Sequence, residues 1–317
     1  MKESNGLHRT GLPVIIQLDE MEPEEFVFFY INNKGDIDRY LLESGAVKFC
    51  GVHIDSLGSF QRIVDSISSK FLSYIDGNSP RIKLSGNVYT STEYDRTQRI
   101  TMHNELSYSA KWPNKLFFCC LQPAETGGET LLADSREILM KMDKDIISEI
   151  WGKGITYIRN LHGGRGMGPS WQDTFETGDK NQLDGYCRSY DIDFEWGPND
   201  TLRLKQSSKG IIEHRTSKER SWFNQIDQFH PCHLGEEIFE AMKMMYDSPE
   251  DFPMYVRFGD GTDISESFIR KVMKTIDENT IAPVWKKNEL LVVDNELVSH
   301  GRNAYTGDRS VLVAMSE

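Results

Sequence analysis

Two histidines and one glutamate are the residues of this chain best suited to hold a metal ion. His103 and Glu105 lie two residues apart in ITMHNEL, and in an extended segment residues at that spacing point to the same side. His300 ends the apolar segment ELLVVDNELVSH, where a strand can bring a side chain to the mouth of a cavity. Two imidazoles and one carboxylate on one face of an octahedron are typical of non-haem iron(II) oxygenases. Taken alone, the spacing also fits a second interpretation, in which the histidines only form hydrogen bonds within strands.

The helices that would help to position these residues follow from the spacing of apolar side chains. Amphipathic helices, with apolar residues every three or four positions, are predicted over 59–76, 134–151, 234–247 and 263–278. Asp134 and Asp263 are each followed three residues later by a glutamate. This pattern is typical of a helix N-terminus, because both side chains can bind free backbone amides.

Strands are predicted in the short segments between these helices. β-Branched and aromatic residues dominate VYTSTEY, KLFFCCLQP, GITYIRN, SWFNQ and ELLVVDNELVSH, and turn residues such as Thr126-Gly127-Gly128 separate them. More strand than helix predicts an α+β protein that is mainly β. Because the chain has no repeat and no linker rich in Pro, Gly and Ser, residues 1–317 are expected to form a single domain.

The stretch 163–209 differs from the rest of the chain in its composition. It is rich in Gly, Asp, Ser and Asn, with aromatic residues in between, among them Trp171, Tyr186 and Trp196. Long irregular segments inside a compact domain often cover a binding site. We expect an insertion here that serves as a lid, or else a variable excursion on the surface.

Charge and composition argue against several classes of function. The formal net charge is −13, from 36 Lys and Arg against 49 Asp and Glu, and no basic stripe could neutralise phosphates, so nucleic acid is not an expected partner. The N-terminal MKESNGLHRTGLPVIIQLDE lacks the apolar core of a secretion signal, and no segment reaches the roughly 18 apolar residues of a membrane span. The five cysteines contain no CxxC pair, which predicts a reducing, cytoplasmic environment.

The sequence around the three candidate ligands resembles one known family. The segments SGNVYTSTEY, ITMHNELSYSAKWPNKLFFCCLQPAETGGET and LLVVDNELVSHGRNAYTGDRSVLVAM are similar to the TauD/TfdA superfamily of iron(II)/2-oxoglutarate dioxygenases. Within it, they resemble the clavaminate-synthase-like branch, and there the amino-acid hydroxylases of the syringomycin-biosynthesis type. The resemblance runs from about Ser85 to the C-terminus. It implies a double-stranded β-helix, or jelly roll, with the metal at one open end and helices packed on the outer face of one sheet.

The resemblance also implies a set of cofactors and the residues that bind them. The family uses Fe(II), 2-oxoglutarate and O2, and its metal ligands are matched by His103, Glu105 and His300. Thr130, at the end of a Gly-Gly-acidic-Thr motif, and Arg309 match the residues that hold the distal carboxylate of 2-oxoglutarate. An arginine fork and a hydroxyl suit that task, because together they donate several hydrogen bonds to one carboxylate.

Two positions narrow the chemistry within the family. Taurine dioxygenase grips its anionic substrate with a second arginine, four residues after the co-substrate arginine, and Val313 stands at that position here. Related halogenases replace the metal carboxylate by a small residue, whereas Glu105 keeps the carboxylate. Neither a sulfonate substrate held in that way nor halogenation is therefore expected.

Residues that contact the substrate are harder to identify from the sequence. Asn87, in GNVYTSTEY, matches a position where related enzymes place residues that face the substrate. Asn224 belongs to a second candidate wall, WFNQ. Asp294 and Asn295 come shortly before His300, and they are expected either to support its imidazole or to form a plain turn.

The expected reaction is hydroxylation of an unactivated C–H bond in an amino acid or a related small metabolite. Succinate and CO2 would be the co-products, and secondary metabolism the setting, with a substrate that is free or tethered to a peptidyl carrier protein. Desaturation, cyclisation and epoxidation use the same ligands and stay open, as does catabolic release of a small fragment. A binding module without turnover and a zinc hydrolase are disfavoured, because the metal ligands, Thr130 and Arg309 are all present.

Overall fold

The largest sheet of the protein has seven strands. The computed structural model describes residues 11–78, 81–91, 94–166 and 168–317. In order across the sheet, the strands are β1 (Val14–Met21), β2 (Ala46–Val52), β15 (Glu289–Asp294), β6 (Lys115–Gln122), β18 (Ser310–Ser316), β4 (Val88–Thr90) and β3 (Lys83–Ser85). β1 and β2 are parallel, and the other neighbours in the sheet are antiparallel.

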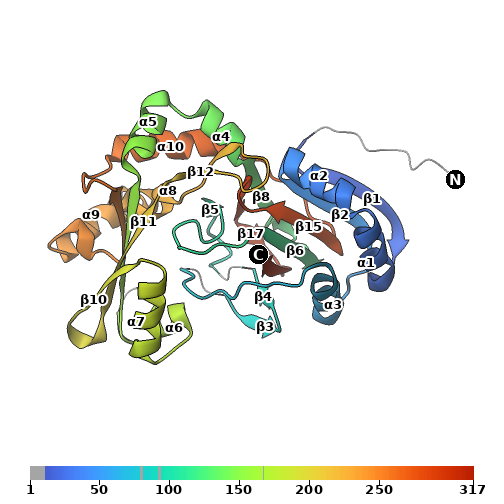
Figure 1. Ribbon diagram of the computed structural model, residues 1–317, viewed down its shortest axis with the longest axis horizontal. Coiled ribbons are helices and arrows are strands. Elements are labelled where there is room, and N and C mark those ends of the chain that lie inside the picture. Colours follow the sequence, from blue (N-terminus) through green and yellow to red (C-terminus); the bar gives the residue numbers. More distant parts are fainter. Residues whose placement is uncertain (1–10, 79–80, 92–93, 167) are drawn as a thin grey trace.

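Both faces of this sheet are buried, and neighbouring residues of one strand face different cores. In β6, Phe117 and Cys119 belong to the core under the first three helices, whereas Phe118 and Cys120 belong to a larger core on the opposite face. This explains why KLFFCCLQ is apolar without alternation, since a strand buried on both faces needs apolar residues at successive positions. Figure 1 shows the three helices on one side of the sheet, and they are α1 (Pro23–Asn32), α2 (Lys34–Ser44) and α3 (Leu57–Ile67).

A second sheet, with three strands, borders the larger core. Its strands, in order, are β5 (Ile100–His103), β16 (Val298–Arg302) and β8 (Thr130–Asp134). The central strand β16 is antiparallel to both of its neighbours. Met102 and Leu132 from this sheet share one core with Phe118 and Val313 from the larger sheet. Two strands of the smaller sheet carry the histidines that the sequence predicts as metal ligands.

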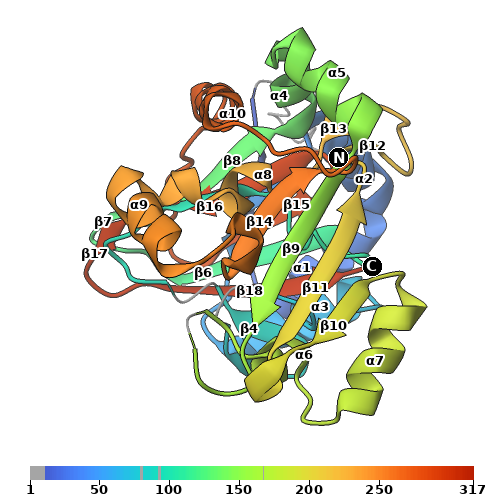
Figure 2. The same ribbon diagram turned by 90° about the vertical axis from the view of Figure 1, so that its left-hand side faces the viewer.

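A third sheet has four strands, and Figure 2 views it from the front. Its strands, in order, are β10 (Asp193–Trp196), β11 (Leu202–Ser208), β9 (Ile155–Leu161) and β14 (Met254–Phe258). Two short ladders join β12 (Ile211–Glu213) to β13 (Arg220–Trp222) and β7 (Thr126–Gly127) to β17 (Tyr305–Thr306). The remaining α-helices are α4 (Ser135–Lys141), α5 (Lys144–Lys153), α6 (Trp171–Phe175), α7 (Lys180–Ser189), α8 (Ile226–Phe229), α9 (Glu236–Met245) and α10 (Glu266–Glu278).

The stretch 163–209 is more regular than its composition suggested. It contains α6, α7 and β10, and its β11 pairs with β9 along seven residues. Trp171, Phe175 and Leu183 pack with Leu202 in a small core of their own. The expectation of an irregular stretch is therefore wrong, while its role as an insertion or a lid stays a prediction.

The predicted helices form, and local side chains determine the residues at which they begin and end. The helix predicted to reach residue 76 ends at Ile67, and Phe71 already pairs with Ser316 of the large sheet. The helix predicted over 134–151 is divided in two, because Asp143 accepts a hydrogen bond from a backbone amide and starts a new helix.

One of the two predicted helix caps is confirmed. Asp134 accepts hydrogen bonds from the backbone amides of Arg136 and Glu137. The prediction for Asp263 is wrong, because the hydroxyl of Ser265 caps α10. Asp263 instead accepts a hydrogen bond of 3.0 Å from the hydroxyl of Tyr255.

Within the described ranges, no helix is both long and apolar enough to cross a lipid bilayer. The five cysteines are all free thiols, and four of them are buried. Buried thiols behave as small apolar residues, so these four add to the cores of the protein.

Asp227 in α8 makes the stability of the protein depend on pH. Burial raises the pKa of this carboxyl from its ordinary value of 3.8 to about 7, and its Oδ1 has no hydrogen-bond partner among the described residues. Because the pKa of Asp227 is higher in the folded protein than in the unfolded chain, the stability that depends on this carboxyl is fully present below about pH 4. It is lost as the pH rises through 7. We expect Asp227→Asn to raise the melting temperature more at pH 8 than at pH 5, as measured by calorimetry. An equal change at both pH values would contradict this, and the exposed Asp65→Asn serves as the control.

Candidate metal centre

The pairing of β16 with β5 brings the three predicted metal ligands together. His103 is the last residue of β5, and it lies opposite His300 in the ladder between the two strands. Ligand atoms of His103, Glu105 and His300 lie within 4.8 Å of one another, and all three residues are buried. In the described part of the chain, this is the one group of three or more His, Cys, Asp or Glu side chains placed to share an ion.

Hydrogen bonding leaves the correct nitrogen of His103 available for a cation. Its Nδ1 lies 2.9 Å from the carbonyl oxygen of Thr101, so Nδ1 carries the proton and donates it, and Nε2 keeps a lone pair for a metal. Nε2 of His300 lies 3.4 Å from Oε2 of Glu105. The buried Nδ1 of His300 has no hydrogen-bond partner among the described residues, and its ring packs against Phe118 with the centroids 5.2 Å apart.

Burial and charge keep these side chains in the protonation states that a divalent cation needs. Burial, together with the neighbouring His300, lowers the pKa of His103 to about 4, so its ring is neutral at pH 7. Burial alone would raise the pKa of Glu105, but the charge of the Arg81 guanidinium holds that pKa well below its usual range. A neutral imidazole and an ionised carboxylate are donors that Fe(II) accepts. The residues present therefore fit the metal.

The side chain of Asn295 fixes the backbone around Glu105. Its Oδ1 accepts a hydrogen bond of 2.7 Å from the amide of Glu105, and its Nδ2 donates to the carbonyl oxygens of Glu105 and Pro113. In the opposite direction, Nδ2 of Asn104 donates to the backbone carbonyl oxygen of Asn295 over 2.7 Å. These bonds join two distant segments at a fully buried point, so they set the position from which the carboxylate reaches the metal.

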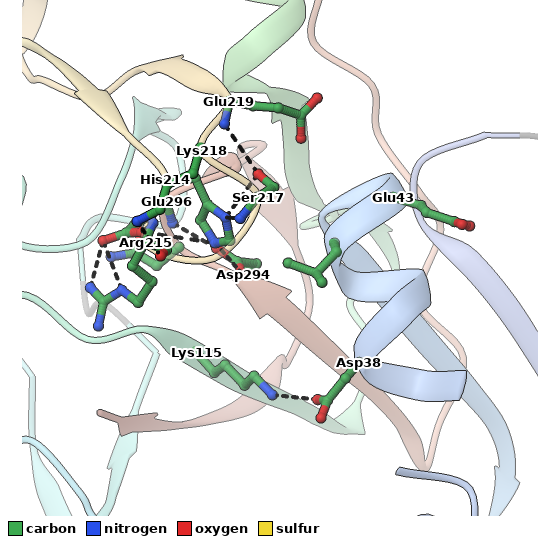
Figure 3. A network of polar contacts seen from close by, with 12 residues as sticks. Asp38, Glu43, Lys115, His214, Arg215, Ser217, Lys218, Glu219, Asp294 and Glu296 are labelled. Carbon is green, nitrogen blue, oxygen red and sulfur yellow. Dashed lines mark hydrogen bonds and ion pairs between the residues drawn. The ribbon is translucent and has the colours of Figure 1, made fainter. Parts of the chain in front are cut away.

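The turn that carries this amide is itself tied to the β12–β13 hairpin by charged side chains (Figure 3). Nε2 of His214 lies 3.2 Å from Oδ2 of Asp294, and Nη2 of Arg215 lies 2.5 Å from Oε1 of Glu296. Asp294 thus holds the turn and does not touch the imidazole of His300. The expectation that Asp294 or its neighbour supports that ring by a hydrogen bond is wrong, because both serve the backbone instead.

Thr130 and Arg309, the residues predicted to bind 2-oxoglutarate, lie beside the metal ligands. Both line one small cavity of about 30 Å³ together with His103 and His300. Thr130 begins β8, which pairs with β16, and Arg309 directly precedes β18. Two sets of residues with different predicted roles therefore share one cavity.

Neighbouring groups hold these two side chains in a position suited to a carboxylate. Nε of Arg309 donates 2.8 Å to the carbonyl oxygen of Gly128, and Nη1 donates 3.1 Å to the hydroxyl of Ser91. The indole of Trp285 donates 3.0 Å to Oγ1 of Thr130, so the hydroxyl proton of Thr130 is left to donate to a ligand. Gly128 has φ +72°, and a Cβ there would lie 3.0 Å from Cδ of Arg309, so a larger residue would disturb the arginine.

The two residues predicted to contact the substrate lie elsewhere. Asn87 sits in the turn between β3 and β4, and Asn224 is buried with its amide donating 2.8 Å to the carbonyl oxygen of Gly210. Neither is among the described residues that line the cavities at the metal ligands. The neighbouring Gln225 does line a cavity of about 400 Å³ that includes His103 and Glu105. The contacts of Asn87 and Asn224 with a substrate stay predictions.

Several residues around the site carry no signal in the sequence. Arg81 donates 2.6 Å from Nη2 to Oε2 of Glu105, Trp285 holds Thr130, and Ser91 holds Arg309. Each is a single residue in a loop or turn, and no spacing pattern marks it. Only its position in the folded chain reveals its role.

Removal of the Asn295 side chain is expected to weaken metal binding. In Asn295→Ala the Glu105 backbone loses two hydrogen bonds and the Pro113 carbonyl loses a third. Removing such supporting groups typically lowers metal affinity about 10-fold to 100-fold. Anaerobic calorimetry with Fe(II) measures this, with the exposed Asn181→Ala as the control. Unchanged Fe(II) affinity in a folded Asn295→Ala protein would show that this amide does not position the ligand.

Trp285→Phe is expected to lower the affinity for 2-oxoglutarate without changing the affinity for Fe(II). The substitution removes the indole N–H that donates to the Thr130 hydroxyl. A lost hydrogen bond of about 1 kcal/mol corresponds to roughly a fivefold loss of affinity. Anaerobic calorimetry with 2-oxoglutarate on Fe(II)-loaded protein measures it, and the exposed Trp151→Phe is the matched control. An equal loss of Fe(II) affinity would mean that the tryptophan acts on the whole site.

Comparison with known proteins agrees with this geometry. The family described as Taurine catabolism dioxygenase TauD, TfdA matches residues 17–315. The chain is 33% identical over 279 residues to the dapdiamide synthesis protein DdaC of Enterobacter agglomerans, covering 88% of this chain and 84% of that protein. It is 28% identical over 287 residues to a clavaminate synthase-like protein of Arabidopsis thaliana, covering 88% and 83%.

Solved structures share the fold at low sequence identity. Asparagine oxygenase, in complex with Fe(II), 3-hydroxyasparagine and succinate, superposes with a TM-score of 0.59 at 12% identity, covering 95% of this chain and 93% of that one. AAD-2, in complex with Mn(II) and N-oxalylglycine, gives 0.59 at 10% identity, covering 98% and 96%. The family match extends over almost the whole chain and includes the His-Glu-His site. The chain therefore belongs to the TauD/TfdA family of Fe(II)/2-oxoglutarate-dependent dioxygenases.

Proposed function

We propose that this dioxygenase hydroxylates an unactivated C–H bond of an amino acid or a related small metabolite in secondary metabolism, and forms succinate and CO2. The observation that carries the proposal is the complete ligand set beside Thr130 and Arg309, next to a cavity of about 400 Å³. DdaC, named for dapdiamide synthesis, and asparagine oxygenase, solved with a hydroxylated amino acid, support the substrate class.

The residues of the site have two separate tasks, metal binding and binding of 2-oxoglutarate. His103 and His300 would bind Fe(II) through imidazole nitrogens and Glu105 through its carboxylate, and the bound iron with 2-oxoglutarate and O2 supplies the oxidising power. Arg309 and Thr130 donate hydrogen bonds to the distal carboxylate of 2-oxoglutarate and so fix its orientation. The retained carboxylate of Glu105 favours hydroxylation over halogenation.

The 400 Å³ cavity has the mixed lining that a small polar metabolite needs. Gln225 and Gln228 offer amides, while Tyr108 and Phe229 offer aromatic surface. Small-molecule sites usually combine apolar walls with a few polar groups that fix orientation. A cavity of this size suits an amino acid or a similar metabolite, whether free or carried on a peptidyl carrier protein.

We also infer the architecture that the family resemblance implies. The seven-stranded and three-stranded sheets that border one core support a double-stranded β-helix with the metal ligands at one end. One domain is supported by the family match over residues 17–315. A lid role for 163–209 is supported by Gln172 and Glu176, which line a cavity of about 710 Å³ together with Tyr74 and Arg81.

The cofactor assignment predicts a visible charge-transfer band when Fe(II) and 2-oxoglutarate are added without oxygen. We expect the band in the wild-type protein, its loss in His103→Ala and its weakening in Arg309→Ala, since these remove a metal ligand and a co-substrate donor. The exposed His53→Ala and Arg62→Ala are the controls. Fe(II) binding without the band in the wild-type protein would contradict the assignment.

With the band established, free amino acids are tested with O2 for products heavier by one oxygen atom, and carrier-bound amino acids follow. A product lighter by two hydrogen atoms would identify desaturation or cyclisation instead. Succinate release that no amino acid stimulates, in either form, would count against this substrate class.

A further inference from the structure

Arg81 is a buried cation in direct contact with a metal ligand. The side chains of Arg81 and Glu105 are 2% and 3% exposed, and they form an ion pair of 2.6 Å between Nη2 and Oε2. The guanidinium also lies over the ring of Tyr74, 4.4 Å from its centroid. Its Nε has no hydrogen-bond partner among the described residues. A buried donor without a partner costs free energy, so this group is suited to receive an acceptor.

Metal binding changes the balance of charge around Arg81. A cation bound by Glu105 takes up the charge of that carboxylate, and among the described residues no other carboxylate forms an ion pair with Arg81. The other buried acid of this segment, Asp76, is already paired with Arg159 at 2.5 Å and accepts a hydrogen bond from Ser109. Arg81 is therefore left with a positive charge to be neutralised by something that enters the site.

The described residues that line the small cavity beside the metal ligands include more cations than anions. Arg81, Arg302 and Arg309 all line it. Burial lowers the pKa of Arg309, and the charge of the neighbouring Arg302 lowers it further. Fe(II) and the 2-oxoglutarate dianion carry equal and opposite charges, so their joint binding does not remove this excess. A further anion would do so.

Arg81 also stands where a substrate would meet the metal. It lines the small cavity with His103 and the cavity of about 710 Å³ next to it. The larger cavity shares Tyr74 and Tyr94 with the 400 Å³ cavity at Glu105. The guanidinium therefore lies between the metal ligands and the 710 Å³ cavity, which borders the cavity in which we place the substrate at these two tyrosines.

We propose that Arg81 binds a free carboxylate of the substrate and so holds the substrate beside the metal. This proposal rests on the proposed function and makes it more specific, because a planar guanidinium binds a carboxylate through two parallel hydrogen bonds. An acyl group held as a thioester has no charge at that carbon, so a free acid is the preferred form. Val313, at the position where taurine dioxygenase has its second arginine, leaves this role open, and Arg81 fills it from a different segment.

The test compares carboxylates with their uncharged amides. L-Amino acids and N-acetyl-L-amino acids, each beside its primary amide, are titrated anaerobically by calorimetry into protein loaded with Fe(II) and 2-oxoglutarate. We expect at least one acid to bind tenfold or more tightly than its amide in the wild-type protein. Arg81→Gln should abolish that preference, because binding of the acid becomes weaker while binding of the amide stays the same. Arg81→Lys should retain part of the preference. Exposed Arg62→Gln is the control.

The charge-transfer band separates failure of this proposal from failure of the proposed function. If the wild-type band forms but every acid binds no better than its amide, or none binds, the carboxylate role of Arg81 is overturned and the cofactor assignment stands. The role is also overturned if Arg81→Gln weakens the binding of acid and amide to the same extent. Where Arg81→Gln does not fold or load Fe(II), Arg81→Lys decides, since an unchanged preference for the acid in a variant with shorter reach and no fork would overturn the proposal.

Discussion

The hydrogen-bond ladder of β16 sets the geometry on which the whole site depends. One edge of this strand places His300 opposite His103 of β5, and the other edge places Arg302 opposite Thr130 of β8. Side chains from three distant parts of the chain thus meet with the spacing that backbone hydrogen bonds dictate. A ladder of this kind tolerates little displacement, because a shift by one residue would turn every side chain to the other face.

Two other buried ion pairs contrast with the pair of Arg81 and Glu105 at the metal centre. Asp76 with Arg159 and Lys48 with Glu289 are buried pairs in which each charge has a partner. Such pairs are costly to break, because the remaining partner would be a buried charge without compensation. Glu105 differs from the other acids, since its partner Arg81 would share it with a cation. The ion pair that can change its partners therefore lies at the metal centre.

The sequence predicted which residues meet at the candidate metal centre, and it missed most of the groups that hold them in place. The spacing of His103 and Glu105 and the resemblance around His300, Thr130 and Arg309 were sufficient, because these residues lie in contiguous motifs. Arg81 acts through a contact with a distant segment, so no local pattern marks it. Asn295 was expected beside His300 or in a plain turn, whereas it binds the backbone of Glu105. The predicted substrate wall WFNQ contains Gln225, which lines the cavity at the metal ligands, and Asn224, which does not. The sequence did not show which of these neighbouring side chains faces the site.

For the fold, the spacing of apolar residues predicted which helices form, and single polar residues decided their limits. Asp143 and Ser265 start helices at positions that apolar periodicity passes over. The composition of 163–209 suggested an irregular stretch because its apolar residues are few, yet those few suffice for a small core. Burial of a handful of large side chains, such as Trp171 and Phe175, is enough to order short helices against a sheet.

That small core has a consequence for how the protein moves. Its buried members are drawn from α6, α7, the turn after α7 and the two inner strands of the four-stranded sheet, β11 and β9, and they form a cluster apart from the two cores at the seven-stranded sheet. Segments with their own few apolar contacts open at lower free energy than the rest of a protein. Local unfolding of α6 and α7 would expose this core and would leave the strands that carry the metal ligands in register. Movements of these two helices can therefore occur while the ladder between β16 and β5 stays paired.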